Sequence, residues 1–131
     1  MSNRMDKKLK ERWIKALRSG KYKQGGGNLR VINKKTNEAK YCCLGVLVDI
    51  ADEFDLEPYE FRGGDSYNDI NEVYAHNGDE SLPDYHWLKS IGLDNNIANR
   101  LASMNDGSHP YVRKHSFKQI ACYIDRMVKT K

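Results

Sequence analysis

The amino-acid sequence predicts an α+β fold, in which a small antiparallel sheet packs against three or four helices. Two segments near the ends of the chain place apolar residues at helical spacing, and a strand–turn–strand pattern lies between them near residues 29–42. A strongly apolar run directly follows that pattern. Because 131 residues is the length of one domain, we expect residues 1–131 to form a single α+β domain.

The first predicted helix begins after Asp6, its expected N-cap, and runs to about Ser19. Gly20 follows in the position of the glycine that ends many helices. Lysines and arginines surround one apolar face, which carries Leu9, Trp13, Ala16 and Leu17.

A hairpin and a central helix are predicted next. Residues 29–32 and 39–42 have strand character, and the polar residues 33–38 between them favour a turn. The most hydrophobic run of the chain extends over residues 43–51 with helical spacing, which indicates a short helix in the centre of the fold. Residues 52–82 are acidic and irregular, and they predict at most one or two short strands.

The remaining residues predict further helices. Residues 83–90 favour a turn or two of helix, and Asp94 is the expected cap of a helix that ends at Met104. Residues 105–115 read as a long polar loop. Ser116 and Gln119 stand at capping-box spacing and predict the start of the last helix.

Charge is segregated along the chain. The net charge of +4 is composed of +10 over residues 1–41, −11 over residues 42–96 and +5 over residues 97–131. The basic ends can converge on a polyanion while the acidic middle faces away. Alternatively, the blocks attract one another, within one subunit or between subunits of an oligomer.

Composition also limits the cellular setting that we expect. No stretch approaches the ~18 uninterrupted apolar residues of a membrane helix, and the first residues lack the apolar core of a secretory signal. We therefore expect no membrane association and a cytoplasmic location. The three cysteines, an odd set with two adjacent members, favour reduced thiols over a disulfide framework.

A glycine-rich segment after the first helix is the strongest candidate for a ligand site. Backbone N–H groups of Gly25 and Gly26 can cradle an anion, Lys21 and Lys23 add positive charge, and Tyr22 offers a face for stacking on a base. The alternative is a connector whose lysines face water. The predicted ligand residues of this segment are Arg18, Lys21, Tyr22, Lys23, Gln24, Gly25 and Gly26.

The polar loop at residues 105–115 is a second candidate. Asn105 can read a base edge, Tyr111 can stack on a base, and Arg113 and Lys114 can contact phosphate. We expect these residues to complete the site if the two segments come together in space.

Catalytic and metal sites are not predicted. Cys42 and Cys43 stand where a helix N-terminus can activate a thiol, but no histidine is fixed beside them, so a core role is favoured. No pair of cysteines or histidines has the spacing of a zinc site, and the acidic residues 52–60 lack the spacing of a calcium loop. We therefore expect no catalytic residue, no metal, no cofactor and no enzymatic activity.

Three motifs together resemble a known group of proteins. They are WIKALRSGKYKQG at residues 13–25, YCCLGVL at residues 41–47 and LASMND at residues 101–106. The combination resembles a family of small proteins encoded by tailed bacteriophages. That family is similar to viral sponge proteins of the anti-CBASS type, which sequester cyclic nucleotide signals of bacterial antiphage defence. The resemblance implies immune evasion in the host bacterial cytoplasm by a homo-oligomer that binds such a signal without turnover.

The sequence hypothesis is therefore a phage anti-defence protein that sequesters a cyclic oligonucleotide or related nucleotide. Two alternatives remain open. One is a nucleic-acid-binding module that uses the basic N-terminal helix, although the acidic middle disfavours a long polyanion. The other is an inhibitor of a host protein that uses the acidic segment as its contact surface.

Overall fold

The computed structural model describes residues 4–26, 28–51, 62–63, 71–75, 82–107 and 113–131. In these residues the chain has an α+β fold of five helices and one five-stranded sheet. The elements in chain order are α1 (Lys7–Arg18), β1 (Lys23–Gln24), β2 (Arg30–Asn33), β3 (Ala39–Tyr41), α2 (Cys43–Ala51), β4 (Arg62–Gly63), β5 (Asn71–Ala75), α3 (Tyr85–Ser90), α4 (Asn95–Asp106) and α5 (Phe117–Met127).

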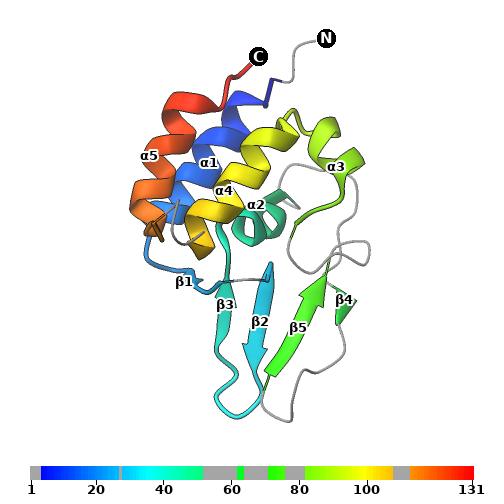
Figure 1. The fold of residues 1–131 in the computed structure, drawn as a ribbon, viewed down its shortest axis with the longest axis vertical. Helices are drawn as coiled ribbons and strands as arrows, with labels where there is room; N and C mark the ends of the chain where they lie inside the picture. Colours follow the sequence, from blue (N-terminus) through cyan, green and yellow to red (C-terminus); the bar gives the residue numbers. More distant parts are fainter. Residues whose placement is uncertain (1–3, 27, 52–61, 64–70, 76–81, 108–112) are drawn as a thin grey trace.

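The helices gather at one end of the molecule and the sheet extends from the other (Figure 1). Helix α1 packs against α5 and α2, and α2 also packs against α4. The two ends of the described chain meet, because Met5 forms a parallel bridge with Thr130. The basic first and last segments of the sequence therefore lie side by side, whereas most acidic residues of the middle segment, including those at positions 52–60, lie outside the described residues.

Local capping signals explain where the helices begin and end. The Asp6 carboxylate accepts a hydrogen bond from the backbone N–H of Leu9 at 3.0 Å, and Gly20 ends the turn after α1 with φ at +78°. Ser116 and Gln119 form the predicted capping box at the start of α5. These boundaries confirm the prediction for both helices.

Helix α2 is the centre of the core. Every residue from Cys43 to Ala51 is buried except Asp49, which is half-buried. A helix that is apolar on nearly all sides must be surrounded, and here α1, α4 and the end of β3 provide that cover. The prediction of a buried central helix is confirmed. None of the helices in the described ranges has the length and apolar character needed to span a bilayer.

The sheet differs from the prediction in one respect. The hairpin of β2 and β3 is antiparallel as expected, with Val31 opposite Lys40, but β1 pairs with β3 in parallel. The sheet is therefore mixed, with strand order β1-β3-β2-β5-β4. Strand β1 was not predicted, because two residues beside a run of glycines carry no periodic signal.

One helical boundary also differs from the prediction. The turn or two of helix expected within residues 83–90 is present as α3, and with it the described chain has five helices where three or four were expected. Helix α4 continues past Met104 to Asp106, where Gly107 ends it with φ at +78°. Asn105 is therefore helical, and the prediction that it opens a loop is wrong.

Candidate functional site

Asn105 joins three distant segments of the chain. Its Oδ1 accepts hydrogen bonds from Gln24 Nε2 at 3.1 Å and from the backbone N–H of Cys43 at 3.2 Å. Its Nδ2 donates to the carbonyl of Gly25 at 2.8 Å and to Asp106 Oδ1 at 3.0 Å. The last turn of α4 is thereby joined to β1 and to the start of α2.

The Asn105 side chain has no remaining capacity for a ligand. Two amide hydrogens and two oxygen lone pairs are all occupied, and the residue is fully buried. Gln24 is similarly engaged, since its Nε2 also donates to the carbonyl of His115 at 2.7 Å. The two candidate segments do come together here, but through hydrogen bonds that position the backbone.

The glycine segment is ordered by the same contacts. The N–H of Gly25 donates to the carbonyl of Tyr41 at 2.8 Å, which continues the pairing of β1 with β3. The predicted anion-binding role of this N–H is therefore wrong, because the sheet uses it. A Cβ at Gly26 would lie 3.5 Å from Asp106 Oδ1, so a carboxylate stands beside this glycine.

Other predicted residues are dispersed around this centre. Lys23 forms an ion pair with Glu38 at 2.7 Å on the exposed hairpin side. Arg113 and Lys114 are exposed beyond α4, and Tyr111 lies outside the described residues. These cations are exposed, whereas Asn105 is fully buried.

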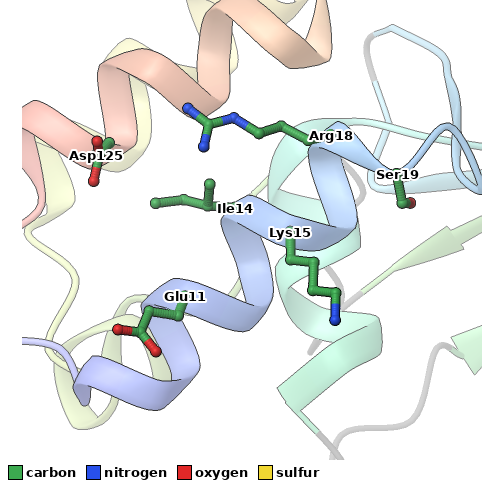
Figure 2. Close-up of a pocket in the computed structure, with 6 residues that line it drawn as sticks. All are labelled: Glu11, Ile14, Lys15, Arg18, Ser19 and Asp125. Carbon is green, nitrogen blue, oxygen red and sulfur yellow. The ribbon is translucent and has the colours of Figure 1, made fainter.

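Arg18 lies in a shallow groove between α1 and α5. Its Nη2 lies 3.7 Å from Cys122 Sγ, and its side chain extends toward α5 (Figure 2). We call this hollow of about 530 Å³ the α1–α5 groove; it is lined by Glu11, Ile14, Lys15, Arg18, Ser19 and Asp125.

A second hollow, on the adjoining face of α1, is lined by three cationic side chains. We call it the basic pocket; it has a volume of about 410 Å³ and is lined by Arg12, Lys15, Ser19, Lys21 and Tyr22. Lys21 and Tyr22 were predicted as ligand residues. The other three were missed, although their spacing along the helix places them on one face.

The turn after α1 gives the basic pocket its shape. Ser19 donates from its backbone N–H at 3.2 Å and from its hydroxyl at 2.7 Å to the carbonyl of Ala16. The same hydroxyl accepts from the backbone N–H of Lys21 at 3.1 Å. The first two hydrogen bonds satisfy the Ala16 carbonyl, which lies at the negative end of the helix dipole. The third holds the backbone of Lys21 in place.

Tyr22 is held as a neutral ring at the edge of the basic pocket. Its hydroxyl donates to Asp49 Oδ2 at 2.5 Å, and its ring meets that of Tyr41 edge-on at 5.0 Å. Burial, and then the hydrogen bond to Asp49, raise the pKa of Tyr22 above its ordinary value. The ring is therefore fixed in place and uncharged at neutral pH.

The adjacent cysteines are core residues, as predicted. Cys42 and Cys43 are buried, and burial raises the pKa of Cys42 to about 12 and that of Cys43 well above its ordinary value. Because the thiolate is the nucleophile, neither sulfur is activated at neutral pH. In the described residues, no three histidine, cysteine or acidic side chains gather in a way that could hold a metal ion.

These differences in burial predict the reactivity of the thiols. At pH 8, the folded protein is expected to release one equivalent of thionitrobenzoate from Ellman's reagent, through the exposed Cys122. Three equivalents are expected after unfolding in guanidinium chloride. A Cys122→Ser variant is the control, and rapid reaction of a folded sample of that variant would contradict the buried placement of the other two.

Comparison with known proteins adds one finding. A family model described as "Domain of unknown function (DUF8296)" matches residues 5–128. No curated protein and no solved structure matches the chain.

Proposed function

The chain belongs to the DUF8296 family, and because the description of that family assigns no function, we propose one from the geometry of the basic pocket. The protein binds a nucleotide through its phosphodiester group, without turnover. The observation that carries this proposal is the set of three cations around one hollow. Arg12 and Lys15 come from α1, and Lys21 comes from the turn that follows it.

The chemistry of the basic pocket favours a phosphate group over a neutral ligand. Arginine and lysine donate charge-assisted hydrogen bonds to phosphate oxygens. Ser19 donates to the carbonyl of Ala16 near the negative end of the helix dipole, so this carbonyl already has a hydrogen-bond partner. Tyr22 supplies an aromatic surface for a sugar or base, and a volume of about 410 Å³ is within the range of small-molecule sites.

Binding should be measured by calorimetry with cyclic di-AMP as the probe. Lys21→Ala and Lys15→Ala are each expected to weaken binding about tenfold, because each removes one charge-assisted contact. Lys8→Ala is the matched control: it removes the same charge from an exposed site on α1 outside the basic pocket, and it should leave the affinity unchanged. Ligand recovered after incubation should be chemically intact by mass spectrometry.

Two results would reject this proposal. The first is failure of the wild-type protein to bind any cyclic di- or trinucleotide, which would reject the ligand class. If the proposal holds, a bound cyclic nucleotide at 100 times its Kd should stabilise the folded protein by about 2.7 kcal/mol. Equal affinities for the Lys21→Ala and Lys8→Ala variants would reject the placement in the basic pocket.

A nucleic-acid-binding role is the second candidate, because the basic character of α1 continues beyond the basic pocket. Lys7 and Lys8 are exposed in its first turn. A single-stranded oligonucleotide should then bind with a steep salt dependence, and Lys8→Ala should weaken it as much as Lys21→Ala. The matched variants thus distinguish two binding modes: a nucleic-acid strand bound along the length of α1, and a small ligand bound in the basic pocket.

The phage-family resemblance supports a biological setting for the proposal. In that setting, a homo-oligomer in the host bacterial cytoplasm lowers the free concentration of a nucleotide immune signal. Light scattering of the purified protein tests the oligomeric state. Mass spectrometry of small molecules released from protein purified out of signalling cells tests the identity of the ligand.

A further inference from the structure

We propose that the basic pocket and the α1–α5 groove form one continuous site, in which the groove selects a nucleobase that carries an exocyclic amino group. This inference rests on the proposed function, because it assigns the second half of the same ligand. It names the groove as a specificity surface and the base as its occupant.

The two hollows share residues. Lys15 and Ser19 line both of them, so they adjoin across one ridge of α1. Each extends along two turns of the helix, about 10 Å. In Figure 2, Lys15 points away from the side on which Arg18 extends, and the same residue also lines the basic pocket.

Charge orients a ligand across this ridge. The charged side chains that line the basic pocket are all cations, whereas the groove places the exposed carboxylates of Glu11 and Asp125 beside the cations Lys15 and Arg18, so its formal charges balance. Those carboxylates repel a phosphate, and they accept hydrogen bonds from N–H groups. The nearly buried Ile14 adds apolar surface against which a flat ring can pack. The phosphate therefore belongs in the basic pocket and the base in the groove.

Arg18 closes one end of the groove. Its guanidinium group lies beside Cys122 on α5 and presents a planar surface on which a base can stack. This assigns a contact with the base to Arg18, which the sequence predicted as a ligand residue.

Carboxylates discriminate between bases because they only accept hydrogen bonds. Adenine presents an exocyclic amino group that donates to them, whereas uracil presents two carbonyl oxygens and a single N–H. A uracil carbonyl directed at Glu11 or Asp125 cannot form a hydrogen bond with the carboxylate, because both groups are acceptors. We therefore expect amino-bearing bases to bind more tightly than uracil.

Cyclic di-AMP and cyclic di-UMP are a matched pair of probes, because they share the backbone and its charge and differ only in the base. By calorimetry, the wild-type protein is expected to bind cyclic di-AMP at least about tenfold more tightly. In a Glu11→Gln/Asp125→Asn double variant, the ratio should fall below about threefold, because amides both donate and accept. Glu38→Gln removes a carboxylate outside the groove and should preserve the ratio.

The outcomes separate the two proposals. Equal affinity of the wild-type protein for both probes would overturn the role of the groove but not that of the basic pocket. The same holds if the double variant leaves the ratio of the two affinities unchanged. Failure of both probes to bind the wild-type protein rejects the proposed function and this inference with it. Circular dichroism of the double variant confirms that its fold is retained, which is expected for two exposed positions.

Discussion

Replacing Asn105 with alanine is expected to lower the free energy of unfolding by about 3 kcal/mol, among the larger effects of a single substitution. The variant would remove four hydrogen bonds at a fully buried position. The buried backbone N–H of Cys43 and the half-buried carbonyl of Gly25 would each lose a partner. Denaturation in guanidinium chloride, followed by circular dichroism, measures the change.

Asn99→Ala provides a matched control for this prediction. Asn99 lies on the same helix but is exposed, and its side chain bonds only locally to the carbonyl of Asn95 at 2.9 Å. Its replacement should change stability by less than about 0.5 kcal/mol. Similar stability losses in the two variants would show that Asn105 does not join the three segments as described. Asn105→Asp should remain destabilising, because a carboxylate cannot donate to Gly25.

The helices could be predicted because their signals are local. Asp6, Gly20, Ser116 and Gln119 act on backbone groups within a turn of themselves, so their effects can be read from neighbouring residues. The apolar run of α2 similarly requires burial whatever surrounds it. These elements therefore depend little on the distant parts of the chain.

Strand β1 and the role of Asn105 could not be predicted, because both depend on partners far along the chain. Gln24 is 81 residues from Asn105, and Cys43 is 62 residues from it. The three motifs that carry the phage-family resemblance thus meet at a structural junction. Polar residues in a motif can form a buried hydrogen-bond network as readily as they can bind a ligand. Only the identity of their hydrogen-bond partners in the folded protein distinguishes these two roles.

The candidate site was found in part for the same reason. Lys21 and Tyr22 stood out beside the glycines, whereas Arg12 and Lys15 looked like members of an ordinary basic helix face. The turn at Ser19 brings the two groups around one hollow. A sequence pattern can identify an exposed basic face, but the fold decides which part of it becomes concave.

The second large effect is expected at Gly45, in the motif at residues 41–47. A Cβ there would lie 1.9 Å from the carbonyl oxygen of Leu29 and 2.8 Å from its carbonyl carbon. That oxygen already accepts a hydrogen bond from the backbone N–H of Cys42 at 3.2 Å, and Leu29 is fully buried. The backbone before β2 must therefore shift, so Gly45→Ala should destabilise the protein by about 3 kcal/mol.

The sign of this effect tests the close approach directly. In an unobstructed helix interior, alanine is more favourable than glycine by about 1 kcal/mol, so substitution would stabilise α2 if Leu29 were more distant. Gly20→Ala is the control: a Cβ there meets nothing within 4 Å, and only its φ of +78° opposes the change. A loss of about 1 kcal/mol is expected at that position. Thermal and guanidinium unfolding of both variants should give the larger loss for Gly45→Ala, and a stability gain in that variant would contradict the packing of α2 against Leu29.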